Sequence, residues 1–397
     1  MDTRIVRVPN KGSLGSFRTG DGLAKLDRWE VHTDQKDASL SLLQDAAQDL
    51  KTKDTPVAFP TETVYGLGAD ATRSGSVKGI YSAKGRPSDN PLIIHVCDLT
   101  MLRQYVGASS QANGHHQDPI PSRYKPLIER FWPGPLTILL PNPEHSKLAP
   151  EVTAGLKTFG VRMPSSPLAL SLISLAGVPI AAPSANASTK PSPTTAQHVM
   201  DDLDGRIELI LDGGQCNVGV ESTVVDGLCE PPVVLRPGGI GLDELRMCPG
   251  WENVVKAYKD QSEEGKAAPR APGMKYKHYS PKARVVLYES SYAKGASGVL
   301  QSDMASANGA VNGTATNGNQ KTRRVGVIRT QRWRSGAVLD IDLGRETEGI
   351  ARGLFSALRE FDRRGADTIF VDGIEDRIDI AAAVMNRLRK AASEIRA

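Results

Sequence analysis

Two short apolar runs, separated by polar residues and a helix within residues 57–96, constrain the fold more than any other part of this sequence. Residues 57–59 are typical of a buried strand, and residues 92–96 predict a second strand, which carries His95. Hydroxyl and carboxylate side chains at residues 61–63 follow the first strand, ahead of a Gly-Leu-Gly sequence that predicts a turn. Both strands therefore bring polar groups to one neighbourhood, as ligand sites in open α/β sheets require.

A basic tetrapeptide, Lys84-Gly85-Arg86-Pro87, follows a predicted helix at residues 76–83. Lysine supplies a compact charge, and arginine supplies a planar group that can donate two parallel hydrogen bonds. That combination suits a polyphosphate. Taken alone, the tetrapeptide fits a solvated basic turn at least as well, but the polar residues on both neighbouring strands favour an anion site.

Strands alternate with helices from residue 36 to about residue 257, and many prolines and glycines interrupt them. This pattern predicts an α/β domain with a twisted, mixed sheet. Residues 1–35 are expected to form a loosely attached arm. Arg162 lies in the predicted strand 158–164, where burial of a guanidinium is costly unless it meets an anion; a place at the sheet edge is the alternative.

Ser184 and Asn186 directly follow a strand of small residues, 179–183. Alternate residues of an extended chain point to the same side, so these two polar side chains share a face. Ser192 lies in the proline-containing loop that we expect to cover them. A Ser-x-Asn sequence occurs in many turns, so its position after the strand is what gives it meaning.

Residues 258–283 are predicted to link this domain to a second one. The first half is polar and charged, whereas residues 271–281 interleave tyrosines with lysines and a histidine, which could stack on a base or clamp phosphates. Residues 284–397 predict a smaller, Rossmann-like α/β domain that closes with a helix at residues 378–395. A segment rich in Ala, Asn, Gly, Ser and Thr, residues 301–320, is expected to be a disordered insertion in it.

Composition limits the classes of protein to consider. The net charge of +4 arises after residue 283, where 18 Lys or Arg face 14 Asp or Glu, which is little for a protein whose main role is nucleic-acid binding. Four widely spaced cysteines favour a reducing compartment over a zinc site or a disulfide framework. The most apolar run, residues 167–183, is too interrupted to cross a membrane. We expect a cytoplasmic protein without a membrane partner, and the basic N-terminus leaves a mitochondrial pool open.

The polar residues suit binding and charge stabilisation better than covalent catalysis. The sequence has no phosphate-binding Gly-x-x-x-x-Gly-Lys-Ser/Thr loop and no Gly-x-Ser-x-Gly elbow. Residues 66–71 fit the dinucleotide pattern Gly-x-Gly-x-x-Ala, but polar residues separate them from the preceding strand, which argues against a Rossmann cofactor site. His115-His116 lie in a polar loop without a nearby carboxylate or cysteine, so a solvated loop is favoured over a metal site.

Several of these motifs, in the same order, resemble the YrdC-like family of threonylcarbamoyl-AMP synthases. The matching residues are Pro60–Thr63, Tyr65–Gly68, Lys84–Pro87, Asn90–Leu92, Ser184, Asn186, Ser222-Thr223 and Arg236–Gly238. The predicted linker resembles the Pro-Gly-Met-Lys-Tyr-x-His-Tyr segment of the longer, two-domain members. The resemblance covers roughly residues 35–397 and departs from the family at residues 1–35, 109–121, 241–270 and 301–320.

The resemblance implies a nucleotidyltransferase that makes L-threonylcarbamoyladenylate from L-threonine, bicarbonate or CO2 and ATP, with release of pyrophosphate. Mg²⁺ would arrive with ATP, without direct protein ligands. The product would pass to a separate tRNA threonylcarbamoyl transferase, which modifies the adenosine beside the anticodon, and a weak contact with tRNA is expected. Two alternatives are an RNA-binding module and a carbamoyl-transfer domain of the kind found in hydrogenase maturation, whose zinc-finger cysteines this chain lacks.

The resemblance also assigns residues to roles. Threonine would be bound by Thr63, His95, Arg162, the Ala182 backbone and Ser222. ATP would be bound by Lys84, Arg86, Asn90, Thr158, Ser184, Asn186, Ser192 and Arg236. Lys84 and Arg86 would be the catalytic pair that stabilises charge on the phosphate oxygens. Lys275, Tyr276, His278 and Tyr279 would form a lid.

Overall fold

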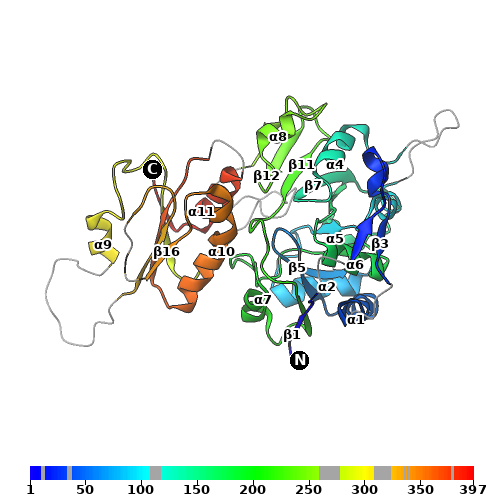
Figure 1. Ribbon diagram of the computed structural model, residues 1–397, viewed down its shortest axis with the longest axis horizontal. Coiled ribbons are helices and arrows are strands. Elements are labelled where there is room, and N and C mark those ends of the chain that lie inside the picture. The colour runs from blue at the N-terminus through cyan, green and yellow to red at the C-terminus, as the bar shows by residue number, and fades with distance from the viewer. Residues whose placement is uncertain are drawn as a thin grey trace.

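The chain forms two α/β units that lie side by side along the long axis of the molecule (Figure 1). The computed structural model describes residues 1–9, 14–33, 38–107, 118–258, 278–307, 323–334, 337, 339–376 and 380–397. The first unit is built on an 11-stranded mixed sheet and the second on a 5-stranded parallel sheet. The predicted α/β class, with a mixed sheet in the larger domain and a smaller α/β domain after it, is therefore confirmed.

The larger sheet runs in the order β1-β10-β4-β5-β9-β6-β8-β7-β11-β12-β13. Its strands are β1 (Arg4–Arg7), β4 (Val57–Pro60), β5 (Tyr65–Asp70), β6 (Ile93–His95), β7 (Leu136–Pro141), β8 (Thr158–Arg162), β9 (Ile180–Ala181), β10 (Leu209–Asp212), β11 (Thr223–Asp226), β12 (Val233–Arg236) and β13 (Val255–Lys256). A separate hairpin pairs β2 (Gly15–Phe17) with β3 (Trp29–Val31).

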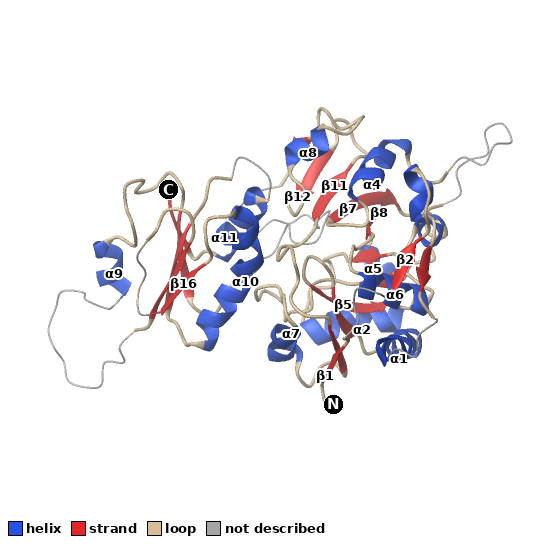
Figure 2. Cartoon of the chain, in the orientation of Figure 1, coloured by secondary structure: helices blue, strands red, loops and turns tan. Residues whose placement is uncertain are grey.

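The helices of the first unit pack against this sheet (Figure 2). They are α1 (Ala38–Thr52), α2 (Ser74–Lys84), α3 (Leu99–Arg103), α4 (Lys125–Phe131), α5 (Pro150–Thr153), α6 (Pro167–Ala176), α7 (Ala196–Leu203) and α8 (Leu242–Arg246), with 3-10 turns at Gly22–Leu26 and Ser122–Tyr124. Apolar residues at helical spacing within residues 36–53 predict an amphipathic helix, and α1 confirms it, because its apolar stripe lies in the core while the opposite face is exposed.

Glycines 66 and 68 lie in strand β5, so the prediction of a turn at this Gly-Leu-Gly sequence is wrong. The strand pairs antiparallel with β4, with Gly68 opposite Val57. A Cβ atom at Gly68 would lie 2.6 Å from the ring of Phe59, which is closer than atoms can pack. The glycines permit close packing between neighbouring strands. A Gly-x-Gly sequence is expected both in a turn and in a closely packed strand, so the sequence alone does not distinguish the two.

The N-terminal residues differ from the expected loose arm. Strand β1 pairs in parallel with β10 at one edge of the larger sheet. Leu14, Leu26 and Trp29 are buried in the first unit's core, and the Trp29 indole nitrogen donates to Ser171 Oγ at 3.0 Å. These residues are short apolar islands among charges and glycines, which is why local pattern alone did not reveal their place in the fold.

The second unit has five parallel strands in the order β16-β15-β17-β14-β18. They are β14 (Arg284–Tyr288), β15 (Val325–Arg329), β16 (Leu339–Asp342), β17 (Thr368–Asp372) and β18 (Glu394–Arg396). Helices α10 (Thr347–Arg363) and α11 (Ala381–Ala391) lie between this sheet and the first unit, while α9 (Gln301–Ala307) lies on the far side (Figure 1). The core under α10 and α11 also includes Val64 and Val220 of the first unit.

Two predictions for this unit need correction. Residues 301–307 form helix α9, because Met304 and Ala307 pack against the sheet; the rest of the expected insertion, residues 308–320, lies outside the described residues. The predicted closing helix ends at Ala391, and the short strand β18 follows it. Among the described residues, no helix combines the length and the apolar character needed to cross a membrane.

Candidate active site

An open pocket lies where the first unit meets the end of the linker. Its space is about 660 Å³, the mouth included. The walls come from the β4–β5 connection, strands β6 and β8, the loop after β9, the segments at β11 and β12, and the linker end. Twelve predicted site residues line it, namely Thr63, Arg86, His95, Arg162, Ala182, Ser184, Asn186, Ser192, Ser222, Arg236, His278 and Tyr279.

One side of the pocket combines a buried guanidinium with hydroxyl groups. Arg162, only 4% exposed, donates from Nη1 to Thr63 Oγ1 at 2.8 Å, and its Nη2 lies 3.9 Å from Glu62 Oε2. Its Nε has no hydrogen-bond partner among the described residues. Burial lowers the Arg162 pKa below its usual value. A small ligand with a carboxylate would supply the missing acceptor and charge.

His95 stands opposite Arg162 on the neighbouring strand. Burial, and then the positive charge of Arg162, hold the His95 pKa well below its usual value, so the imidazole is neutral at physiological pH. Its Nδ1 has no hydrogen-bond partner among the described residues. The ring is therefore available to a polar ligand beside Arg162.

The other side of the pocket carries Arg86 and Arg236. Arg236 donates from Nε and Nη2 to the Ser222 carbonyl at 3.1 and 2.9 Å and from Nη2 to Ser222 Oγ at 3.0 Å. Arg86 donates to the carbonyls of Asn90 and Pro91 at 3.3 and 3.0 Å. Burial is the main reason that the pKa of each arginine falls to about 10. An anion bound between them would offset this cost of burial.

Three predicted ATP-binding residues do not line the pocket. Lys84 is buried, and its Nζ donates to the Ser184 and Asn186 carbonyls at 2.5 Å each. In this structure Lys84 therefore stabilises the loop after β9. Burial holds the Lys84 pKa well below its usual value. Asn90 is buried behind Arg86, and Thr158 begins β8. Direct contacts of these three with ATP remain predictions.

The end of the linker reaches the pocket through His278 and Tyr279. The Tyr279 ring stacks on Phe355 of α10, with centroids 5.3 Å apart, and the Arg387 guanidinium lies 5.7 Å from its centroid. The second unit thus holds this wall of the pocket in place. The other predicted lid residues, Lys275 and Tyr276, lie outside the described residues.

Sequence reasoning missed Glu221. Its Oε1 accepts from Ser192 Oγ at 2.5 Å, and its Oε2 accepts from Arg387 Nε at 3.0 Å. Burial alone would raise the Glu221 pKa, but Arg387 and Arg236 together lower it to about 2. Its place just before the Ser222-Thr223 motif was a signal that could have been used, whereas nothing local to helix α11 pointed to Arg387.

Comparison with known proteins assigns both units. A family model described as telomere recombination, which is named for Sua5, YciO and YrdC, matches residues 50–238. A model described as threonylcarbamoyl-AMP synthase, C-terminal domain, matches residues 240–393. The chain is 48% identical over 373 residues to the threonylcarbamoyl-AMP synthase of Schizosaccharomyces pombe, with 89% of each chain covered.

The chain belongs to the threonylcarbamoyl-AMP synthase family.

Members from distant organisms extend this relationship over nearly the full length. The Bacillus subtilis synthase is 43% identical, with 93% of this chain and 98% of the relative covered. The solved structure of Pyrococcus abyssi Sua5 complexed with L-threonine matches with a TM-score of 0.74 and 37% identity and covers 99% of both chains. The family resemblance inferred from the motifs is therefore confirmed.

The synthase-family pocket offers few groups that could hold a metal directly. Among the described residues, no three His, Cys, Asp or Glu side chains form a cluster with metal-ligand geometry. Glu221, the carboxylate in the pocket wall, is already bound to Arg387 and Ser192. Mg²⁺ that arrives with ATP, without direct protein ligands, stays a prediction.

Proposed function

We propose that this chain makes L-threonylcarbamoyladenylate from L-threonine, bicarbonate or CO2 and MgATP, with release of pyrophosphate. The main support is that one pocket contains Arg86, Arg162 and Arg236 together with several hydroxyl groups. Such a set can bind two anionic substrates and stabilise charge between them. The names of the relatives at 43–48% identity supply the reaction.

The Arg162 side of the pocket is the proposed threonine site. The guanidinium would bind the amino-acid carboxylate, with Thr63, the neutral ring of His95, the Ala182 backbone and Ser222 as further polar contacts. Two observations support this site. Arg162 Nε and His95 Nδ1 have no hydrogen-bond partner among the described residues, and the Pyrococcus abyssi relative has been solved in complex with L-threonine. The threonine amine would face the rest of the pocket, where it forms a C–N bond to give a carbamate, with loss of water from bicarbonate or, with CO2, of a proton from the amine.

The Arg86–Arg236 side is the proposed ATP site, completed by Ser184, Asn186 and Ser192, with Lys84, Asn90 and Thr158 at its margin. A carbamate oxygen attacks the α-phosphorus of ATP, the bond to the bridging oxygen breaks, and pyrophosphate leaves. Charge develops on the phosphate oxygens, and the two guanidinium groups stabilise it there. Mg²⁺ bound to ATP supplies further charge stabilisation.

Product transfer completes the proposal. The mixed anhydride is prone to hydrolysis, so a closed pocket would protect it. The proposed lid includes His278 and Tyr279, which line the pocket. The product would pass to a tRNA threonylcarbamoyl transferase for modification of the adenosine beside the anticodon. We also propose a cytoplasmic location and a weak contact with tRNA, as the family resemblance implies.

Pyrophosphate release tests this function directly. The purified chain should release pyrophosphate only when threonine, bicarbonate, ATP and Mg²⁺ are all present. Equal release without threonine would contradict the proposal and indicate a nucleotidase. Binding of RNA without any threonine-dependent release would instead favour the RNA-binding alternative.

A further inference from the structure

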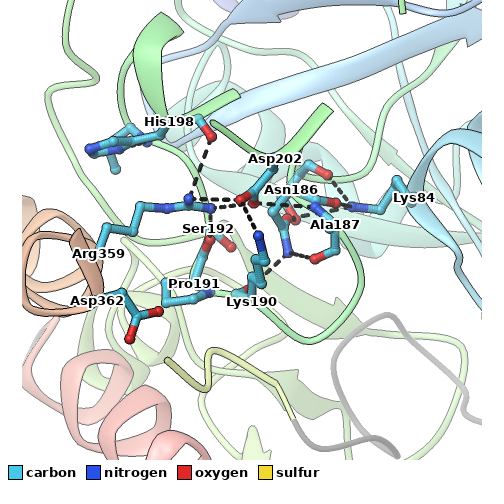
Figure 3. A network of polar contacts seen from close by, with 12 residues as sticks. Lys84, Asn186, Ala187, Lys190, Pro191, Ser192, His198, Asp202, Arg359 and Asp362 are labelled. Atoms are coloured by element: carbon cyan, nitrogen blue, oxygen red, sulfur yellow. Dashed lines mark hydrogen bonds and ion pairs between the residues drawn. The ribbon is translucent and has the colours of Figure 1, made fainter. Parts of the chain in front are cut away.

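The loop at residues 184–192, which supplies Ser184, Asn186 and Ser192 to the pocket, is fastened on three sides (Figure 3). Lys84, at the end of α2, binds its carbonyls from one side. Asp202 of α7 binds it from a second side. Arg359 of α10, which belongs to the second unit, reaches across the domain boundary and binds it from the third.

The pair formed by Arg359 and Asp202 is buried, with side-chain exposures of 9% and 1%. The guanidinium binds the carboxylate in a bidentate manner, at 2.7 Å to Oδ2 and 3.2 Å to Oδ1. It also donates to the carbonyls of Pro191 and His198. A planar fork with these four contacts fixes orientation as well as distance, which a lysine could not do.

Asp202 passes this constraint on to the loop. Its Oδ2 accepts from the Ala187 backbone nitrogen at 3.3 Å, and its Oδ1 accepts from Lys190 Nζ at 2.9 Å. Burial alone would raise the Asp202 pKa, but the hydrogen bond from Arg359 and the contact with Lys190 lower it on balance, so the group stays ionised. The carboxylate is therefore a permanent acceptor for the loop.

The residues held by this pair are adjacent in sequence to residues that line the pocket, with Ala187 next to Asn186 and Pro191 next to Ser192. The Asn186 amide donates to the carbonyls of Ala187 and Lys190 at 2.9 Å each, and its Oδ1 accepts from Ser184 Oγ at 2.5 Å. Pro191, whose carbonyl Arg359 binds, is adjacent to Ser192. A shift of the Arg359–Asp202 pair would thus move pocket-lining groups, although neither residue lines the pocket.

We propose that Arg359 is a positioning residue for ATP. Through Arg359, docking of the second unit determines the conformation of the 184–192 loop. This inference rests on the proposed function, because it assigns the 184–192 loop to ATP. Docking of the second unit and ATP binding are then thermodynamically coupled, so each favours the other. Threonine binding, whose proposed site is formed by Arg162 and His95 on other strands, is expected to be independent of this coupling.

Arg359→Ala should raise the KM for ATP by roughly 10- to 100-fold, the scale of a misplaced positioning group. The KM for threonine should change by less than about 2-fold. Arg359→Lys keeps the charge but not the fork, so it should recover only part of the loss. Arg352→Ala is the matched control, because Arg352 also lies on α10 and crosses to the first unit, donating at 2.9 Å to the Asn217 carbonyl, away from the loop.

Equal losses for ATP and threonine, or an equal ATP defect in Arg352→Ala, would overturn the proposal. Titration calorimetry with a non-hydrolysable ATP analogue measures the same effect without turnover, so it tests Arg359 even if threonine-dependent pyrophosphate release is never observed. If Arg359→Ala does not fold, the double variant Asp202→Asn/Arg359→Met removes both buried charges together. Wild-type affinity for the analogue in that folded double variant would also overturn the proposal, and weakened affinity would support it.

Discussion

Arg387 of helix α11 and Glu221 at the pocket wall form an ion pair across the domain boundary, with Nε and Oε2 3.0 Å apart. Arg387 has no exposed side-chain surface, and Glu221 is 10% exposed. The same arginine binds the Pro237 carbonyl and lies over the Tyr279 ring. One side chain of the second unit therefore contacts the wall, the strand end and the linker end of the pocket.

Removal of Arg387 should cost both stability and turnover. Arg387→Met removes the direct ion-pair partner of the buried Glu221, and the loss of one partner of such a pair costs roughly 3–5 kcal/mol. Urea unfolding measures the stability and pyrophosphate release measures turnover. Arg389→Met is the control, because Arg389 lies on the same helix but pairs with Glu289 and Asp376 inside the second unit. If both variants lose turnover to the same degree, the link from Arg387 to the pocket is refuted.

Substitution of Arg86 should impair the use of ATP, whereas substitution of Arg162 should impair the binding of threonine. Arg86→Ala should lower kcat/KM for ATP by roughly 10²-fold or more, the scale of losing one charge-stabilising donor, and leave threonine binding without ATP nearly unchanged. Arg162→Ala should abolish most threonine binding and leave binding of an ATP analogue nearly unchanged. Calorimetry with each ligand alone separates the two. The division of the pocket into two halves is wrong if either variant affects both ligands equally.

Selection of threonine over serine should be moderate. The pocket is partly apolar, with Val64, Ile93 and Ala182 in its lining. One methyl group in such surroundings is worth about 1–3 kcal/mol, or roughly 10- to 200-fold in kcat/KM. Pyrophosphate release with each amino acid gives the ratio directly, and a ratio near one would show that the methyl group meets no apolar wall.

Local sequence patterns predicted many of the helices and strands and most of the residues that line the pocket, but not the residues of the second unit that support it. The α1 stripe, the strands that carry His95 and Arg162, and the Ser184–Asn186 pair depend on neighbours within a few residues, so their periodicity is visible in the chain. Arg359 and Arg387 contact residues 157 and 166 positions away in sequence. No local pattern encodes such partners. In the sequence, Arg359 and Arg387 resemble any other basic residue on the exposed face of a helix.

Two residues have surroundings that the local sequence does not reveal. Gly68 is needed for close approach to Phe59 within a sheet, and the sequence around it reads equally well as a turn. Lys84 was assigned to phosphate because of its place beside Arg86. In the fold it lies at the end of α2, where its Nζ meets two carbonyls of the 184–192 loop. Which carbonyls surround a lysine is a property of tertiary packing.

The protein should lose stability as pH falls below about 6.5. Burial, and then Arg162, lower the His95 pKa well below 6.5, and burial also lowers the pKa of His198 to about 4 and of His278 to about 3. The unfolded chain therefore binds protons that the folded chain does not, and each group costs at most about 1.4 kcal/mol per pH unit. The effect is absent at pH 8 and grows between pH 6.5 and pH 5.

Urea unfolding at pH 8, 6 and 5 measures this slope. His95→Gln should make it shallower by up to one proton equivalent. His145→Gln, which replaces an exposed histidine in the loop after β7, controls for the loss of a histidine as such. An unchanged slope in His95→Gln would mean that folding does not lower the His95 pKa, and the idea that burial keeps this ring neutral in acid would have to be abandoned.

The stack of Tyr279 on Phe355 should protect the adenylate from water. It joins the linker end to α10 of the second unit and closes one side of the pocket, so its loss opens a path for water to a mixed anhydride. Tyr279→Ala should lower the yield of threonylcarbamoyladenylate for each pyrophosphate released, and because the ring is buried in the core it should also lower the thermal midpoint. Tyr279→Phe keeps the stack and should keep most of the yield.

A double-mutant cycle shows whether the stack itself is responsible. Phe355→Ala should reproduce the loss of yield seen in Tyr279→Ala, and the double variant should be little worse than either single variant, because both remove the same contact. Chromatography of the nucleotide products gives the ratio of adenylate to AMP, and a pyrophosphate assay gives total turnover. If Tyr279→Ala slows pyrophosphate release but leaves the product ratio at the wild-type value, this residue aids binding or chemistry and does not exclude water. Additive effects in the cycle would mean that Tyr279 and Phe355 act on the pocket separately.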